Sequence, residues 1–257
     1  MKTFAENSRI LFIIVSIWRE EHRLIRLNGD LTNRISSVDV DTWKSETLNQ
    51  VIDAGIDLLN ITFDEDFRRD LLQRSLGSVH LLREACRRVC RMSGLTETHA
   101  GRKPRNIGSA VDAAEIISQI VSEQAGRYRS FLMQFANGLQ QTDYEMPKWI
   151  IYAILCSPVD QLNDGLRLRR ITATIRAKHP KRKELNNAHV EQILNSVSLL
   201  QTKIGTRPLV LDYDAAKSSL DIVDKAFLIW LATQNIKELM DDLGLPESLD
   251  SKVLEAF

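Results

Sequence analysis

One stretch near the N-terminus is apolar over almost its whole length, and it constrains the fold more than any other part of the sequence. This stretch runs from Ile10 to Ile17. A strand that is apolar on both faces is buried on both faces, which is typical of a central strand in a parallel sheet. A short helix over 18–26 and a turn at Asn28-Gly29 then lead to a second short strand over 34–40. The sequence therefore predicts that the chain begins with a strand, a helix and a strand of an α/β core.

Apolar residues at helical spacing dominate the rest of the chain, which predicts a mainly α protein with small β elements. In the segment 41–95, Asp64 is suited to cap one helix and another helix runs over 78–92. A polar, basic linker or exposed loop over 96–106 precedes one long helix over 109–140. These patterns divide the chain into a core segment at 1–40, a helical module at 41–95, a linker and long helix at 96–142, and a last domain at 143–257.

The last domain has its own order of elements. Three helices are predicted first, and two strands follow them at 208–213 and 220–224. The helices are expected at 146–156, 168–178 and 188–203. Three helices followed by a hairpin is the order of a winged helix-turn-helix domain.

Bulk composition excludes several classes of function. The 34 Lys and Arg residues balance 34 Asp and Glu residues, so no global field attracts nucleic acid or a membrane. No apolar run approaches the roughly 18 residues that span a membrane, and the N-terminus lacks a signal-peptide cleavage site. We therefore expect a cytoplasmic protein with no membrane partner. Cys86, Cys90 and Cys156 form no disulfide framework, and we interpret the first two as core residues, so no metal site is expected.

Three blocks of the N-terminal half resemble, in their order, the second half of a AAA+ or STAND-type ATPase core. The run from Ile10 to Ile17 is similar to the strand that ends in the sensor 1 residue, here Ser16. Arg34 ends a Leu-Thr-Asn-Arg loop where many such ATPases have an arginine finger, whose guanidinium stabilises charge on the transferred phosphate. The segment 63–90 resembles the helical lid, and the resemblance makes His80 the candidate for nucleotide contact.

A fourth block extends the resemblance into the last domain. Leu220 to Leu231 resembles the Val-Asp-Pro-x-Phe-x-x-Trp/Tyr-Leu ending of winged helices in archaeal and STAND ATPases, with Lys225 in place of the usual Pro. The resemblance implies a remnant of an α/β P-loop core and a helical lid, followed by a winged helix. It also implies nucleotide-dependent assembly or regulation, in a defence system or a mobile element. The partners would be a missing N-terminal ATPase half or neighbouring subunits.

The chain departs from the ATPase pattern at the phosphate site. No Gly-x-x-x-x-Gly-Lys-Ser/Thr sequence occurs in the 257 residues, so the chain has no phosphate-cradling loop. No apolar strand ending in paired acids precedes Ile10, so no Walker B carboxylate is available to hold magnesium. We therefore expect ATP and Mg²⁺ only in an intact full-length protein, and no hydrolysis by this chain alone.

A second hypothesis comes from another class: a winged-helix DNA-binding regulator. A basic cluster falls on the second helix of the last domain and the turn after it. Its members are Arg167, Arg169, Arg170, Arg176, Lys178, Lys181, Arg182 and Lys183. Arg176 and the run 181–183 are expected to contact phosphates. The next helix is expected to present outward the polar residues Glu191, Gln192, Asn195, Ser198 and Gln201. Of these, Gln192, Asn195 and Ser198 are the candidate base readers. Docking of another protein is the other interpretation of the same domain.

Overall fold

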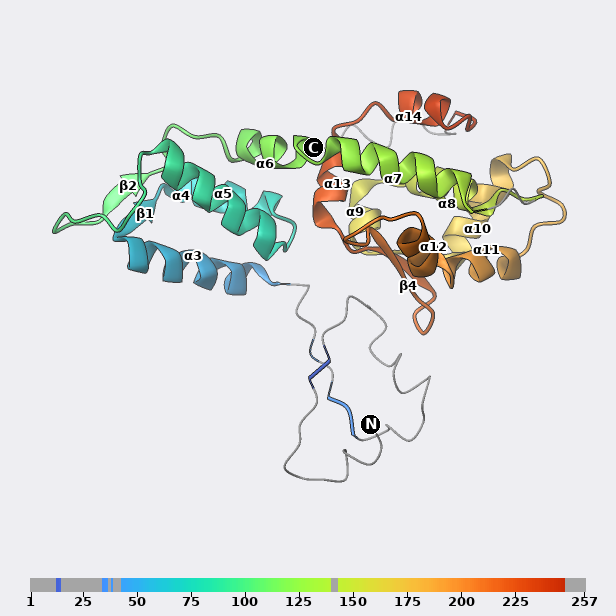
Figure 1. Cartoon of the computed structure of the whole chain (residues 1–257), viewed down its shortest axis with the longest axis horizontal. Helices are drawn as coiled ribbons and strands as arrows, with labels where there is room; N and C mark the ends of the chain where they lie inside the picture. The colour runs from blue at the N-terminus through green and yellow to red at the C-terminus, as the bar shows by residue number, and fades with distance from the viewer. Residues whose placement is uncertain (1–12, 15–33, 37, 39–42, 140–142, 248–257) are drawn as a thin grey trace.

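A computed structural model describes residues 13–14, 34–36, 38, 43–139 and 143–247 of the chain. The described part is mainly helical with two small sheets, as the sequence predicts. It forms two helical lobes, and helix α6 (Ala113–Ser122) lies between them (Figure 1). Most of the expected core segment 1–40 lies outside the described residues; of its apolar run, Ile13 and Ile14 are described and are exposed. No described helix has the length and apolar character needed to cross a bilayer.

The first lobe is built from three helices and a two-stranded sheet. Its elements are α3 (Ser45–Leu59), β1 (Ile61–Phe63), α4 (Glu65–Arg74), α5 (Val79–Met92) and β2 (Arg105–Ile107). The expected cap is confirmed, because the Asp64 carboxylate accepts hydrogen bonds from the amides of Asp66 and Phe67 at the start of α4. The helix expected over 78–92 is also confirmed, as α5.

The exposed loop predicted over 96–106 is confirmed for 96–104, whereas its last two residues form the start of strand β2. This strand pairs in parallel with β1, with Ile61 opposite Arg105 and Phe63 opposite Ile107. The loop before β2 is held by the Asn60 side chain, whose amide donates to the carbonyls of His99 and Gly101 at 2.9 and 2.8 Å. These contacts join residues about 40 positions apart, so no local pattern of the linker could indicate them.

The connection between the lobes corrects the prediction of one long helix over 109–140. The chain forms two helices, α6 and α7 (Ala125–Asn137), which are separated at Gln124. Gln124 leaves helical geometry at φ −102° and ψ 0°, and its side-chain oxygen accepts hydrogen bonds from Tyr128 and Arg127. The break lets α6 pack against α4, α5 and α13, whereas α7 packs against α8 and α13.

The second lobe contains the remaining elements. They are α8 (Met146–Leu155), α9 (Val159–Asn163), β3 (Leu166–Arg167), α10 (Leu168–Lys178), α11 (Asn187–Leu194), α12 (Val197–Lys203), β4 (Leu211–Asp214), β5 (Ser219–Ile222), α13 (Lys225–Ala232) and α14 (Ile236–Asp242). The helices expected at 146–156 and 168–178 and the two strands are confirmed. The helix expected over 188–203 is instead the pair α11 and α12. It is broken where Ser196 adopts φ −101° and its hydroxyl donates back to the carbonyl of Gln192.

The sheet of the second lobe has the strand order β3-β5-β4, and both pairings are antiparallel. Leu220 on the central strand lies opposite Leu166 on β3 and Tyr213 on β4. Gly165 leads into β3 with φ +88°, and an added Cβ there would collide with the side chains of Asp221 and Ser219. Only glycine combines this backbone conformation with such a close approach, so Gly165 lets the short strand β3 join the sheet.

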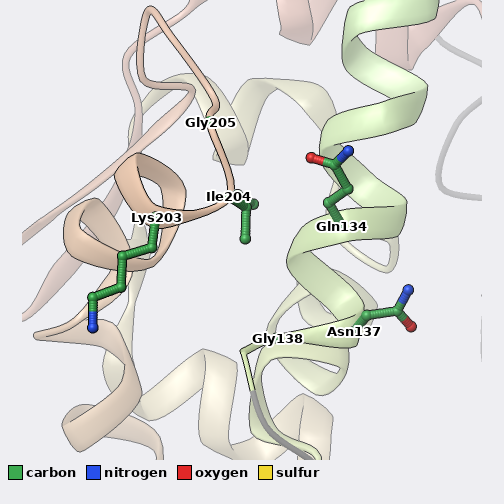
Figure 2. Close-up of a pocket in the computed structure, with 6 residues that line it drawn as sticks. All are labelled: Gln134, Asn137, Gly138, Lys203, Ile204 and Gly205. Atoms are coloured by element: carbon green, nitrogen blue, oxygen red, sulfur yellow. The ribbon is translucent and has the colours of Figure 1, made fainter.

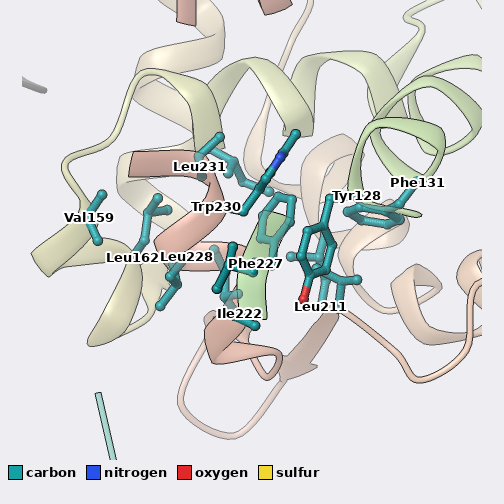
Figure 3. Packing of buried hydrophobic residues seen from close by; sticks show 14 of the residues in the cluster. Tyr128, Phe131, Val159, Leu162, Leu211, Ile222, Phe227, Leu228, Trp230 and Leu231 are labelled. Atoms are coloured by element: carbon teal, nitrogen blue, oxygen red, sulfur yellow. The ribbon is translucent and has the colours of Figure 1, made fainter. Parts of the chain in front are cut away.

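An aromatic cluster joins α7 to α13 in the core (Figure 3). Tyr128 lies 5.4 Å from Phe227 and 5.5 Å from Trp230 between ring centroids, and Phe131 lies 5.7 Å from Phe227. Each such pair contributes about 0.5–1.5 kcal/mol beyond its buried area. All four side chains are buried. Helix α13 is therefore a central packing element of the second lobe.

A polar cluster at the start of α13 reinforces this packing. The Asp224 carboxylate caps α13 through the amide of Ala226 and forms an ion pair with Arg127 at 2.9 Å. It also accepts a hydrogen bond from the Tyr128 hydroxyl, and Arg127 donates to the carbonyl of Pro208 at 2.7 Å. Burial raises the pKa of Tyr128, and the nearby Asp224 carboxylate raises it further. The Asp224–Arg127 pair thus links α7, α13 and the loop before β4.

Acid should weaken the ion-pair cluster on α5 through Glu84. Hydrogen bonds from Arg87 and Arg88 hold the pKa of Glu84 down at about 2, and Arg88 also reaches Glu123 beyond the end of α6 at 2.7 Å. Because the folded pKa is depressed, this stabilisation is complete above the ordinary value of 4.5 and is lost as pH falls toward 2. We expect Glu84→Gln to lower the free energy of unfolding by about 1 kcal/mol at pH 7 and to have little effect near pH 2.

Urea denaturation at a series of pH values measures this difference. Glu97→Gln is the matched control, since Glu97 is exposed and has no ion-pair partner among the described residues. A Glu84→Gln variant whose unfolding free energy runs parallel to that of wild type from pH 7 to pH 2 would contradict the assignment.

Candidate functional site

The basic turn between α10 and α11 is anchored by a buried histidine. His179 is 3% exposed, and its Nδ1 accepts a hydrogen bond of 2.9 Å from the amide of Lys181. Its Nε2 lies 3.0 Å from the carbonyl oxygen of Tyr144, which can only accept, so Nε2 carries the proton. The ring also packs 4.7 Å from that of Trp149 on α8. These contacts fix the turn on the body of the lobe.

The turn itself presents three consecutive cations to solvent. Lys181, Arg182 and Lys183 are all exposed. The amide of Arg182 donates to the carbonyl of His179, and the amide of Glu184 donates to that of Lys181. The ammonium of Lys181 lies 5.3 Å from the centroid of the Tyr144 ring, which is a cation–π distance. The cations are therefore held on an ordered backbone.

Helix α10 carries the other basic residues of the cluster. Its buried side is formed by Leu168, Ile171, Thr172 and Ile175. Arg169, Arg170, Arg176 and Lys178 are exposed on the remaining surface. Arg167 differs, because its guanidinium donates to the carbonyl of Lys217 in the turn between β4 and β5. The structure thus brings the predicted phosphate contacts onto one helix and the turn that follows it.

The helices α11 and α12 correct part of the predicted base-reading surface. Gln192 and Asn195 are exposed as expected, but Glu191 is half-buried and the Ser198 hydroxyl donates to Asp212 at 2.6 Å. Gln201, expected outward, is fully buried. The side-chain nitrogen of Gln201 donates to the carbonyl of Leu211, and its side-chain oxygen accepts from the backbone amide of Leu211. The side chain thus bonds to β4 as a neighbouring strand would. The expectation assumed one continuous helix over 188–203 with all of these residues on one face. The break between α11 and α12 divides that face.

The residues assigned by the ATPase resemblance are not brought together in the described part of the chain. Ser16 lies outside the described residues. Arg34 is exposed at a turn, and His80 is exposed in the first turn of α5. No contact among the described residues joins these two side chains.

The two cysteines of α5 are placed for packing rather than for reactivity. Burial raises the pKa of Cys86 to about 12, with a further increase from Cys90, so its thiol is protonated at neutral pH. Cys90 is buried and Cys86 is half-buried against the core, which agrees with core packing for this pair. Within the described ranges, no three His, Cys, Asp or Glu side chains are grouped as metal ligands.

Two depressions of the described surface are open and shallow. Figure 2 shows the first, where the end of α7 meets the end of α12. It is lined by Gln134, Asn137, Gly138, Lys203, Ile204 and Gly205. Lys203 is the one titratable side chain of this lining, so no acid–base pair is present. The second depression is acidic, but Asp64 and Asp112 in it are already occupied as helix caps.

The comparisons with known proteins add no relative. No family model, curated protein or solved structure matches the chain.

Sequence reasoning missed the two residues that organise the candidate interface. His179 stood out in the sequence only as part of the His-Pro pair that ends α10, and Gln201 only as a polar residue of a helix. One sequence feature could have drawn attention to His179 as an anchor of the basic turn: it stands directly before a proline and a Lys-Arg-Lys run. Nothing local indicates that Gln201 pairs with a strand about ten residues away.

Replacing His179 should loosen the basic turn without changing its charges. In His179→Phe the ring can still pack on Trp149, but the amide of Lys181 and the carbonyl of Tyr144 lose their partner. We expect a loss of about 1–3 kcal/mol in unfolding free energy, and faster hydrogen exchange at the Lys181 amide.

His189→Phe serves as the matched control. His189 stacks on Tyr144 at 4.9 Å, and its Nδ1 has no hydrogen-bond partner in the described structure. The control should change stability by less than about 0.5 kcal/mol. Unchanged protection of the Lys181 amide in His179→Phe would show that the histidine does not hold the turn.

Proposed function

We propose that this chain is the C-terminal portion of a cytoplasmic AAA+/STAND-like ATPase that acts in nucleotide-dependent assembly or regulation, in a defence system or a mobile element. The observation that carries the proposal is the arrangement of the second lobe. Three helical segments (α8, α10 and the pair α11–α12) accompany a sheet of order β3-β5-β4, in which β4 and β5 form a tight hairpin. This is the arrangement expected of a winged helix, and it follows a helical lobe suited to be an ATPase lid.

The block from Leu220 to Leu231 supports the same proposal. Its Asp224 caps α13 and binds Arg127, while Phe227 and Trp230 pack on α7. Asp224, Phe227 and Trp230 therefore have structural roles in this block. These roles do not require the Pro that the family usually has at the position of Lys225. We expect the same contacts in any protein that shares the block.

The packing of α6 supports a role in assembly or regulation. Helix α6 contacts α4 and α5 of the first lobe and α13 of the second. A nucleotide-dependent shift of the first lobe would reach the second through this helix. In the intact protein, Arg34 is the proposed arginine finger, Ser16 the sensor 1 residue and His80 the lid residue nearest the nucleotide, with Mg²⁺ and ATP held by the missing half or by a neighbouring subunit.

Reconstitution with the ATPase half tests the proposal. The reading frame before Met1 should encode a Gly-x-x-x-x-Gly-Lys-Ser/Thr loop. We expect no hydrolysis by this chain alone, and hydrolysis when both halves are co-expressed. Arg34→Ala should then lower kcat by about 10³-fold or more, because an arginine finger stabilises the transition state.

Arg102→Ala, at another exposed arginine, is the matched control and should leave kcat within about twofold. Calorimetry of the isolated chain supplies the opposing outcome. Stoichiometric ATP binding with micromolar affinity, or a preceding frame without the phosphate loop, would contradict the proposal.

A DNA-binding regulator is the second candidate function, and one observation favours it. The cations at 181–183 are exposed on a turn that His179 holds in place. Fixed cations bind phosphates better than mobile ones, because less conformational entropy is lost on binding. The exposed side chains of Gln192 and Asn195 are the candidates for contact with bases.

A gel-shift titration at two salt concentrations tests this candidate. We expect the triple change Lys181→Ala, Arg182→Ala and Lys183→Ala to weaken binding to every duplex alike. The slope of log K against log[salt] should become shallower by up to about 3, since each lost phosphate contact removes about 0.9. A second triple change removes three exposed arginines of the first lobe, Arg83, Arg91 and Arg102, and should leave the slope unchanged. No detectable binding by wild type at low salt would leave the protein-docking interpretation.

A further inference from the structure

The exposed face of α10 is unusual in having only cations and small residues. Arg169, Arg170 and Arg176 lie on it, with Ala173 and Ala177 between and beside them. Arg169 and Arg176 are seven residues apart, which is about 10 Å along a helix. No Asp or Glu occurs from 165 to 183. The face therefore has a concentrated positive charge. The alanines between and beside the arginines leave no bulky side chain that would block close approach of a ligand.

The cations of this face differ in their pairing from several other arginines of the described chain. Several arginines elsewhere form ion pairs: Arg74 with Asp70, Arg88 with Glu123 and Arg129 with Asp242. By contrast, Arg169, Arg170 and Arg176 have no ion-pair partner among the described residues. Their guanidinium groups are free to bind an external anion, and a guanidinium binds phosphate oxygens through two parallel hydrogen bonds.

The residue types on the exposed face of α10 indicate which kind of polyanion it can bind. A protein-docking surface is usually centred on large apolar anchors, and single-stranded nucleic acid requires aromatic side chains on which bases stack. The exposed face of α10 has neither, since alanine is its one apolar residue type. A regularly spaced array of phosphates with the bases hidden, as in duplex DNA, fits a flat cationic face of this kind.

The neighbouring helices α11 and α12 are poorly equipped to read bases. Lys203 is the one Lys or Arg in the segment 187–203. Ser198 is committed to Asp212, and the next residue, Leu199, is apolar and 57% exposed. A broken helix with a single cation at its end can add contacts but cannot supply most of the affinity.

We propose that the face of α10 formed by Arg169, Arg170 and Arg176 binds the phosphate backbone of duplex DNA, and that this contact, with the turn 181–183, makes binding independent of sequence. The proposal rests on the DNA-binding candidate function and specifies its mode. Phosphate contacts position a protein on the duplex but carry no sequence information. The domain would therefore hold DNA in place for another component rather than select a site.

Fluorescence anisotropy with three duplexes of unrelated sequence, measured at two salt concentrations, tests the proposal. We expect wild type to bind all three within about threefold of one another. The triple variant Arg169→Gln, Arg170→Gln and Arg176→Gln should lose at least about tenfold in affinity at low salt, with a slope of log K against log[salt] shallower by about 2–3. The single variant Arg176→Gln should reduce the slope by about 0.9 and covers the case in which the triple variant is poorly folded.

Two control variants make the failures distinguishable. Arg83→Gln with Arg91→Gln removes exposed charge from α5 in the first lobe and should bind as wild type does. Gln192→Ala with Asn195→Ala tests base contact separately, because a change of sequence preference in this variant would show that bases are read. If wild type binds no duplex even at low salt, the DNA-binding function itself fails. If wild type binds but the α10 variants bind equally well, or if the Gln192/Asn195 variant loses a marked sequence preference, the DNA-binding function stands and this proposal is overturned.

Discussion

The structure depends most on one partly buried carboxylate, that of Asp224. It caps α13, pairs with Arg127 at 2.9 Å and accepts the hydroxyl of Tyr128. Its side chain is 14% exposed, so its charge must be compensated inside the protein. The compensating side chains, Arg127 and Tyr128, lie on α7, about 100 residues away along the chain. The orientation of α7 on the second lobe follows from this requirement.

The sequence predicted the elements that depend on local chemistry. The helix capped by Asp64 and the three-helix and hairpin order of the second lobe follow from capping residues and periodicity, which neighbouring residues determine. The elements that it missed depend on distant partners. Strand β2 exists because it pairs with β1. The long helix breaks at Gln124 because two separate surfaces must be covered, and a periodicity that continues across the break does not reveal this.

In the candidate interface, too, local features were predictable from the sequence, and features that depend on distant partners were not. Exposed cations were predictable, because a run such as Lys-Arg-Lys after a His-Pro pair is rarely buried. The side chains that organise the interface were not. Gln201 is polar, yet it is buried as the hydrogen-bond partner of β4, and His179 is buried as the anchor of the turn. A buried polar residue must find partners, and the sequence does not state where those partners lie.

A double-mutant cycle on Asp224 and Tyr128 tests most directly whether the carboxylate ties α7 to the second lobe. The free energy of unfolding is measured for wild type, Asp224→Ala, Tyr128→Phe and the double variant. If the two groups interact as described, the two losses are not additive, and the coupling free energy is about 1 kcal/mol or more. Losses that add to within about 0.3 kcal/mol would show that the two side chains do not interact, and would contradict this account of how the lobe is held together.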